Sequence, residues 1–377
     1  MKMNMREIFT YAPFAVLVLS FLVFVLRARL GLRAKALWFL WLAACFSKFY
    51  CFRKFGGHVF YPEFPQALIV LWDVAYSGAL MLTLIAIPFF FRFRFKAVLL
   101  PLAAWTTAAV GVWNGIRVPL VNEMELAFPD LPASLEGYRI AQISDLHCSS
   151  AARRWRTAAI VEKVNSLDAD LVCLTGDYVD GYVSERGADM LPLKDLRAKD
   201  GVYYVTGNHE FYRDRVNWEK WYRENGMRFL VNECVFPRPE LALGGVNDSV
   251  AKHYKRTPAD VRQAFAAATN GEFRVLLQHR PETAKDNIEE IGVDLQLSGH
   301  THGGVAPIVR QLVSKHNRGF SRGIYRYGDG VLYVSPGAGQ WAGFPIRFRN
   351  PSEVAVFKLV KGKKNGGDDQ ENLSLGQ

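Results

Sequence analysis

The stretch VDLQLSGHTHGG, residues 293–304, is an apolar run that ends in a glycine and then presents His300 and His302. An apolar run closed by turn residues is typical of a β-strand that leads into a loop. Two histidines separated by one residue are either metal ligands held by a tight loop or polar residues of an ordinary turn. The rest of the chain decides between these interpretations.

The same strand-then-loop pattern occurs four more times upstream. The runs are YRIAQISDLH (138–147), DLVCLTGDYVD (170–180), GVYYVTGNHEF (201–211) and FRVLLQHRPE (273–282). Between the first two lies RRWRTAAIVEKVNSL (153–167), which has helical spacing. Strands interleaved with helices predict an α/β domain in which helices cover a central sheet.

The residues that follow these strands are suited to binding metal. Reactive groups in open α/β sheets gather where strands end, and the candidates at those ends are Asp145, His147, Asp177, Asn208, His279, His300 and His302. Carboxylates and imidazoles suit divalent transition ions, and the absence of cysteine from the set argues against a structural thiolate zinc site. Asp145 and His147, two apart in an extended strand end, are expected to face one ion.

Seven ligands exceed the four that a single tetrahedral ion takes, and they are enough for two ions that share one bridging carboxylate. Two such ions clamp the attacking and the leaving oxygen of a phosphoryl displacement, and a hydroxide between them supplies the nucleophile. The sequence therefore predicts a phosphoester hydrolase with two divalent metal ions. The donor set does not select among manganese, iron, zinc or a mixture of them.

The five motifs SDLH, GDYVD, GNHE, LQHRPE and GHTHGG stand in an order that resembles the calcineurin-like metallophosphoesterases, and most of all their membrane-associated bacterial branch. The resemblance covers roughly residues 118–360 and implies a four-layer α/β/β/α sandwich. It also implies one ion held by Asp145, His147 and His302, and a second held by Asn208, His279 and His300. Asp177 would then bridge the two ions, and His209 would stabilise the transition state or protonate the leaving group.

Several neighbouring residues are open to two interpretations. Asp180 either orients a ligand or caps a loop. Arg153, Arg154 and Arg156 either contact phosphate or form a solvated charge run, and the second is favoured. Cys148 stands where relatives usually have an apolar residue, and we interpret it as a packing residue rather than an oxidation-sensitive one. The glutamate of GNHE, Glu210, replaces the commoner aspartate.

Residues 1–117 predict an all-α transmembrane region, and 361–377 a disordered polar tail. Apolar stretches near 8–26, 36–50, 66–91 and 98–115 predict about four spans. Within them, Lys48 is expected to reach out from a helix end and Asp73 to lie at the interface. All of the net charge of +10 belongs to this region, because residues 121–377 hold equal numbers of basic and acidic side chains. This distribution argues against nucleic acid as a partner.

The connections between the spans predict the orientation of the chain. Four basic residues lie between the first two stretches and Arg92, Arg94 and Lys96 between the last two. The positive-inside rule then favours a cytoplasmic location for these connections. With four spans, the catalytic domain would be extracytoplasmic, in a bacterial inner or plasma membrane. A miscounted helix reverses this side.

The sequence thus predicts a membrane-anchored phosphohydrolase that cleaves a phosphoester or pyrophosphate bond. A phosphorylated small molecule or a lipid-linked substrate at the bilayer is the expected partner, and no protein partner is identifiable. The alternative is a non-catalytic membrane sensor or scaffold that binds phosphate ligands. A lost metal ligand or a missing counterpart of His209 would favour that alternative, and the sequence shows neither.

Overall fold

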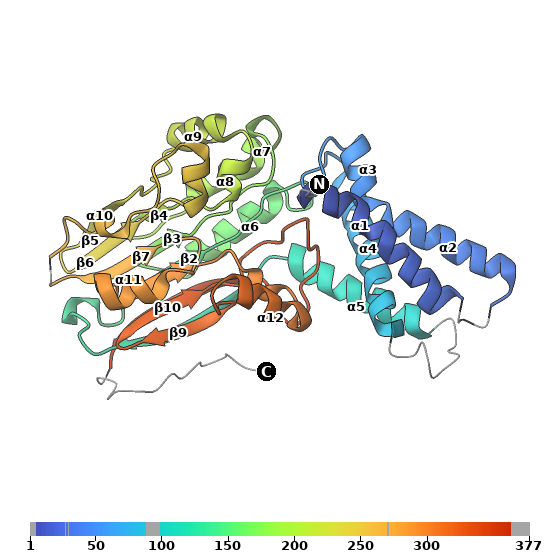
Figure 1. Ribbon diagram of the computed structural model, residues 1–377. Coiled ribbons are helices and arrows are strands. Elements are labelled where there is room, and N and C mark those ends of the chain that lie inside the picture. Colours follow the sequence, from blue (N-terminus) through green and yellow to red (C-terminus); the bar gives the residue numbers. More distant parts are fainter. Residues whose placement is uncertain (1–4, 27, 29, 88–98, 270, 363–377) are drawn as a thin grey trace. The chain divides into compact units, whose positions relative to one another are not determined.

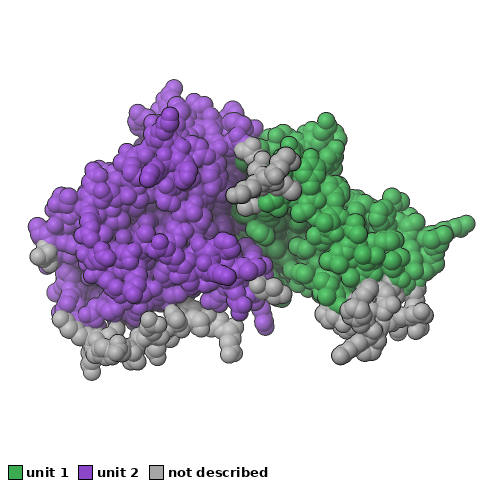
Figure 2. Space-filling view, in the orientation of Figure 1, with its two compact units in different colours: residues 1–117, 341–348 green, residues 118–340, 349–377 purple. Residues whose placement is uncertain are grey.

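The computed structural model describes residues 5–26, 28, 30–87, 99–269 and 271–362. The chain forms two compact units, which Figures 1 and 2 show. A helical unit comprises residues 1–117 together with 341–348, and a catalytic unit comprises 118–340 and 349–377. The expected tail beyond residue 362 lies outside the described residues.

The helical unit is built from five α-helices and one π-helical segment among its described residues. The helices are α1 (Met5–Ser20), α2 (Leu32–Phe46), α3 (Lys48–Phe55), α4 (Gln66–Ala86) and α5 (Leu99–Ile116), and the π-helical segment Phe21–Val25 continues α1. The segment 341–348 packs in this unit, where the ring of Trp341 lies 5.2 Å from that of Phe60 and the amide of Arg347 donates to the Gly111 carbonyl.

Three helices of the described residues are long and apolar enough to cross a membrane: Glu7–Val25, Gln66–Ala86 and Leu99–Ile116. The expected span at 36–50 is not among them, because the chain there is divided at Ser47 between α2 and α3. The 15 residues of α2 rise about 22 Å, which is short of a hydrocarbon core of about 30 Å. Three of the four expected spans thus coincide with helices of sufficient length, and the fourth stays a prediction. Residues 88–98, with Arg92, Arg94 and Lys96, lie outside the described residues.

Lys48 and Asp73 form a buried ion pair within the helical unit. The Lys48 Nζ lies 2.5 Å from the Asp73 Oδ1, and the two side chains are 0% and 3% exposed. The ammonium group also lies 4.4 Å from the centre of the Phe49 ring. Lys48 therefore does not reach out from a helix end, and Asp73 faces the protein interior, while its depth in a membrane stays a prediction. Each neutralises the other and links α3 to α4.

The catalytic unit contains two mixed β-sheets. The first has the order β1-β11-β2-β3-β4, with β2, β3 and β4 parallel. Its strands are β1 (Leu120–Phe128), β2 (Arg139–Ile143), β3 (Leu171–Leu174), β4 (Val202–Tyr204) and β11 (Glu353–Lys361). The second has the order β5-β6-β7-β8-β10-β9, with β6, β7, β8 and β10 parallel. Its strands are β5 (Glu233–Arg238), β6 (Leu241–Gly245), β7 (Phe273–Leu277), β8 (Leu295–Ser298), β9 (Gly323–Tyr327) and β10 (Gly330–Val334).

Helices cover the outer faces of both sheets. Residues of α6 (Arg154–Asn165), α7 (Val183–Met190) and α9 (Arg215–Glu224) pack on the first sheet, and residues of α10 (Val261–Ala264) and α11 (Ala284–Ile291) pack on the second. The remaining helices are α8 (His209–Tyr212) and α12 (Pro307–His316). The expected four-layer α/β/β/α sandwich is confirmed, and the single central sheet expected from the strand pattern alone is a pair.

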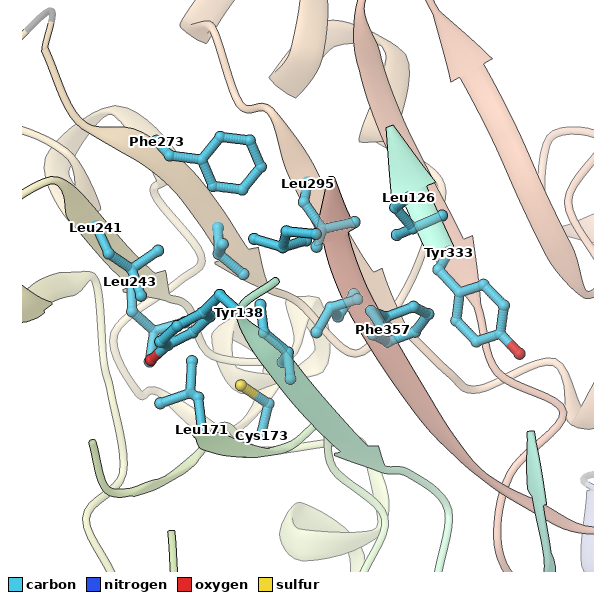
Figure 3. Packing of buried hydrophobic residues seen from close by; sticks show 14 of the residues in the cluster. Leu126, Tyr138, Leu171, Cys173, Leu241, Leu243, Phe273, Leu295, Tyr333 and Phe357 are labelled. Atoms are coloured by element: carbon cyan, nitrogen blue, oxygen red, sulfur yellow. The ribbon is translucent and has the colours of Figure 1, made fainter. Parts of the chain in front are cut away.

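The two sheets share a core because their strands are apolar on both faces. In β3, Leu171 and Cys173 face the core between the sheets, whereas Val172 and Leu174 face α6 and α7. Successive residues of a strand point to opposite faces, so each strand contributes to two cores. Figure 3 shows the inner core, in which side chains of both sheets, among them Leu171 and Leu295, meet.

Candidate metal centre

The predicted ligands lie in the loops that follow β2, β3, β4, β7 and β8. The first three strands are parallel neighbours in one sheet, and the last two are parallel neighbours in the other. The carboxyl ends of parallel neighbours lie at the same edge of a sheet. Five loops that are far apart in the sequence therefore bring their side chains together.

Asp145, His147 and His302 form one group of potential ligand atoms. The Nε2 atoms of His147 and His302 are 3.1 Å apart, and the His302 Nε2 lies 3.5 Å from the Asp145 Oδ1. Asp145 and His147 are fully buried. These are the three residues that the sequence resemblance assigned to one ion.

A second group consists of Asp177, His279 and His300. The Nε2 of His279 lies 3.2 Å from the Asp177 Oδ2 and 3.2 Å from the His300 Nδ1. Asp177 also belongs to a third group with His147 and His209, at 3.9 Å from each. Because its carboxylate takes part on both sides, Asp177 occupies the position that a bridging ligand needs.

The ligand loops have an unusual backbone. Asp145, His147, Asp177, His300 and His302 all have positive φ angles, between 44° and 72°. Residues other than glycine rarely adopt this region, and such conformations cluster at functional sites. The expectation that Asp145 and His147 extend a strand was wrong, because β2 ends at Ile143 and both residues are left-handed. Their side chains converge through the turn instead.

Asp180 orients two of the histidines. Its Oδ2 lies 3.1 Å from the His147 Nδ1, and its Oδ1 lies 2.5 Å from the His209 Nδ1. The carboxylate is buried, and it accepts a hydrogen bond from each ring. Of the two interpretations of Asp180, the structure favours the orienting role over the loop cap. Both Nε2 atoms are left to face the group of ligands.

A similar contact orients His279. Its Nδ1 lies 2.7 Å from the Thr175 carbonyl, which can only accept, so Nδ1 carries a proton and Nε2 is the atom that would bind a metal. Imidazole lone pairs and buried carboxylate oxygens point at shared positions in this site. That is the donor set a divalent transition ion requires, so the residues fit metal.

Carboxylates raise the pKa values of His279 and His209, whereas burial lowers that of His300. Burial lowers the pKa of His279, but the carboxylates of Asp177, Asp145 and Asp248 together outweigh it and raise the pKa to about 10. Burial also lowers the pKa of His209, whereas Asp177 and Asp180 raise it to about 9. Burial and the neighbouring His279 hold the pKa of His300 well below its ordinary value. The site concentrates negative charge, which attracts cations.

Glu210 supports the ligand loops from behind. Its carboxylate accepts hydrogen bonds from the amides of Asp177 at 2.9 Å, Tyr178 at 2.7 Å and Gly207 at 2.7 Å. Burial and the Asp177 carboxylate raise its pKa to about 7. The glutamate of GNHE thus ties the loop after β4 to the loop after β3, a role that the sequence alone did not suggest.

Close packing explains two of the glycines in the motifs. A Cβ at Gly207 would lie 2.2 Å from the Asp177 Oδ1, and a Cβ at Gly299 would lie 2.2 Å from the Asp145 Oδ2. Contacts of this length are not possible between a carbon and an oxygen that are not bonded. The ligand carboxylates therefore sit against glycine backbone.

Arg280 and Asp248 adjoin the predicted ligand Asn208. The Arg280 Nε donates to the Asp248 Oδ2 at 2.8 Å, and its Nη2 donates to the Asn208 Oδ1 at 3.1 Å. The sequence assigned no role to Asp248, and Arg280 was not singled out. Asn208 is buried at the predicted place, and its contribution to a metal site stays a prediction.

The other residues with two interpretations are also placed. Arg156 is buried and donates to the Ala338 carbonyl, so the expectation of a solvated residue was wrong for it. Arg153 and Arg154 are on the surface, near Asp189. Cys148 is buried in the core beside α6, and burial raises the pKa of its thiol to about 12. The packing interpretation of Cys148 agrees with this environment.

Comparison with known proteins agrees with the geometry. Residues 138–304 match the family model of the calcineurin-like phosphoesterases. A metallophosphoesterase of Aquifex aeolicus is 31% identical over 247 residues, which are 65% of this chain and 93% of that protein. The chain belongs to the calcineurin-like phosphoesterase family. Its catalytic unit is accordingly a phosphoester hydrolase domain.

Other calcineurin-like relatives are longer than the Aquifex aeolicus protein. A metallophosphoesterase of Helicobacter pylori is 32% identical over 257 residues, 66% of each chain. A zebrafish protein described as a transmembrane protein with a metallophosphoesterase domain is 33% identical over 264 residues, 67% of this chain and 60% of that one. The chain thus spans somewhat less than two thirds of these relatives.

Solved structures of similar chains include a dimetal phosphatase from zebrafish and the NAD nucleotidase of Haemophilus influenzae. The first has a TM-score of 0.37 and 13% identity over 60% of this chain and 93% of that chain. The second has a TM-score of 0.37 and 15% identity over 54% of this chain and 45% of that chain. Similarities of this size carry no conclusion about activity.

Proposed function

We propose that this calcineurin-like protein is a membrane-anchored phosphohydrolase that uses two divalent metal ions. The observation that carries the proposal is the pair of ligand groups joined by Asp177. Asp145, His147 and His302 would hold one ion, and Asn208, His279 and His300 the other. Such ions supply Lewis acidity toward the phosphate oxygens and a nucleophile at neutral pH.

His209 is the proposed proton donor to the leaving group. Its Nδ1 is held by Asp180. Its side chain is 15% exposed, whereas those of Asp180 and His147 are 1% and 0% exposed, so among these three residues His209 is the one that substrate can reach. The Asp180 carboxylate accepts a hydrogen bond from the His209 Nδ1 and raises the pKa of the ring, which would favour the protonated form that a general acid requires. Arg280, at the edge of the same site, supplies a positive charge that can face a phosphate.

The proposed substrate is a phosphoester or pyrophosphate with a lipid or another envelope-linked group. Three helices can cross a membrane, and apolar side chains such as Leu37, Leu71 and Trp113 face outward from the helical unit. A relative is described as a transmembrane protein. A domain held at a bilayer reaches amphipathic substrates there, and a phosphorylated small molecule is the other proposed class. The balanced charge of residues 121–377 continues to argue against nucleic acid.

The side of the membrane is a separate proposal. With three spans in place of four, the two ends of the helical region lie on opposite sides. An amino end outside would then place the catalytic unit in the cytoplasm. Labelling of single cysteines in intact cells with a membrane-impermeant maleimide, in a variant without other cysteines, distinguishes the two sides.

The test of the activity uses full-length protein in detergent. It should hydrolyse bis-p-nitrophenyl phosphate or p-nitrophenyl phosphate with added manganese and lose the activity when a chelator is present. His300→Ala should abolish turnover, whereas His316→Ala, on the exposed end of α12, should not change it. Turnover that survives both the chelator and His300→Ala contradicts the proposal. Binding of manganese and phosphate without turnover of any tested ester would favour the sensor or scaffold instead.

Substrate class is tested with the same protein. A panel of lipid phosphates, nucleotide-linked lipids and soluble nucleotides is compared by kcat/KM in mixed micelles. A lipid-linked ester that exceeds its water-soluble headgroup analogue by tenfold or more supports the proposed class. Equal values for both forms mean that the helices only localise the enzyme.

A further inference from the structure

A cavity of about 470 Å³ lies beside the ligand loops of the catalytic unit, bordered by α8 and α9. None of the predicted metal ligands lines it, and neither does His209. Glu210 and Phe211 of α8 do line it, so the short helix separates the cavity from the metal centre. The volume is within the range of small-molecule sites.

Aromatic rings form the apolar walls of the cavity. Trp218 and Tyr222, on one face of α9, stack with ring centres 5.5 Å apart and planes 26° apart. The Tyr222 ring also lies 4.8 Å from that of Phe229. Clustered rings of this kind favour a flat apolar group that stacks on them or meets their edges.

Tyr222 adds a polar group to these walls. Its hydroxyl is buried and has no hydrogen-bond partner among the described residues. The indole of Trp218, in contrast, donates to the Gly181 carbonyl at 3.0 Å. Buried hydroxyl groups nearly always have a partner, so the Tyr222 hydroxyl marks a place in this wall where a hydrogen bond is missing.

Arginines give the cavity a positive rim. Arg215, Arg223 and Arg256 line it together with one rim carboxylate, that of Glu219. Glu219 pairs with Arg256 at 2.8 Å and with Arg215 at 3.4 Å, whereas no ion pair of Arg223 is found among the described residues. The carboxylate of Glu210 is engaged by three backbone amides. The rim therefore carries an excess of positive charge that suits an anion.

We propose that this cavity is a second ligand site, which binds a small aromatic anion such as an aryl phosphate or sulfonate. The ring packs against Trp218, Tyr222 and Phe229, and the anion pairs with Arg223 at the rim. The site is separate from the metal centre and does not depend on the proposed function. Through Glu210, its floor is hydrogen-bonded to the backbone of Asp177.

The probe is 1-naphthalenesulfonate, which has the ring and the charge but no bond that a phosphohydrolase cleaves. Its binding to full-length protein in detergent is measured by calorimetry, with protein-free micelles as the blank. Saturable binding of about one probe per chain is expected, at least tenfold tighter than that of neutral 1-naphthalenemethanol. Binding should persist in the presence of a chelator. Absence of saturable binding, or binding lost with the chelator, overturns the proposal.

Two pairs of variants locate the site. Arg223→Ala should weaken binding roughly tenfold or more, because it removes a charge-assisted contact. Lys220→Ala, an exposed charge on the same helix that does not line the cavity, should leave binding unchanged. Val231→Trp fills the cavity and should abolish binding, whereas Val216→Trp, exposed on α9 outside it, should not. Equal effects within either pair contradict the location.

Discussion

Replacing Asp180 by asparagine tests how the metal centre and the proposed acid are connected. The carboxylate holds the Nδ1 of His147 at 3.1 Å and the Nδ1 of His209 at 2.5 Å. Asparagine has the same shape, but only one of its two terminal atoms accepts a hydrogen bond. One of the two histidines therefore loses its acceptor and faces an amide NH2 group.

The size of the effect follows from the lost contact. A hydrogen bond to a charged group contributes about 1.5 to 3 kcal/mol. At about 1.4 kcal/mol for each factor of ten, kcat/KM should fall roughly 10- to 100-fold. Outer partners of metal ligands have effects of about this size.

The assay separates the two histidines. Metal content, measured by mass spectrometry after gel filtration, falls if His147 loses its orientation. A series of aryl phosphates with leaving groups of increasing pKa reports on His209, because proton donation matters most for poor leaving groups. Asp180→Asn should therefore lose more activity with phenyl phosphate than with p-nitrophenyl phosphate. Asp286→Asn, an exposed carboxylate of α11, is the control.

One result refutes the reasoning. If Asp180→Asn keeps its full metal content and the wild-type kcat/KM for the poorest leaving group, Asp180 orients neither histidine. An equal loss for all leaving groups with a reduced metal content would leave only the contact with His147.

Three further predictions concern the supports of the site and the helical unit. Gly299→Ala places a Cβ 2.2 Å from the Asp145 carboxylate and should abolish metal binding as measured by calorimetry with manganese. Glu210→Gln puts an amide NH2 where backbone amides donate and should reduce the free energy of unfolding by about 1 to 3 kcal/mol. The Tm in a thermal scan should fall by roughly 2 to 10 °C. Lys48→Met or Asp73→Leu alone leaves an unpaired buried charge and should reduce the free energy of unfolding by about 3 to 5 kcal/mol. The double variant should lose less stability. Thermal unfolding in detergent measures both.

Matched substitutions control these predictions. Gly271→Ala adds the same carbon where only one atom lies near, 4.0 Å away, and should bind metal normally. Glu224→Gln removes an exposed carboxylate and should leave the Tm unchanged. A double variant of Lys48 and Asp73 that is as unstable as the sum of the single variants would show that the two charges do not stabilise each other.

Local sequence carries much of the fold. The runs ending at Ile143, Leu174, Tyr204, Leu277 and Ser298 were predicted as strands, and all are strands. Apolar periodicity and turn residues are properties of a short window, so they can be recognised without knowledge of distant residues. The number of sheets is not such a property. It depends on which strands pair, and the strand pattern alone suggested one sheet where the structure has two.

The spans show the same limit. The composition of residues 36–50 is apolar enough for a membrane helix, but the structure divides this segment at Ser47, and Lys48 pairs with Asp73 of α4. A hydropathy pattern reports how apolar a segment is and not where its helix ends. The number of spans decides the predicted side of the catalytic unit.

By itself, the sequence determined which residues are candidate metal ligands, because the acids and histidines that follow the strands are identifiable by type and position. The tertiary structure alone decided how these residues meet. Asp145 and His147 converge through left-handed turns. Hydrogen bonds join residues of different loops, from His147 and His209 to Asp180 and from the Asp177 amide to Glu210. Contacts between distant segments leave no local pattern, so only the folded chain shows them. The cavity beside α9 is also visible only in the folded chain, since its walls and its charged rim come from separate parts of the sequence.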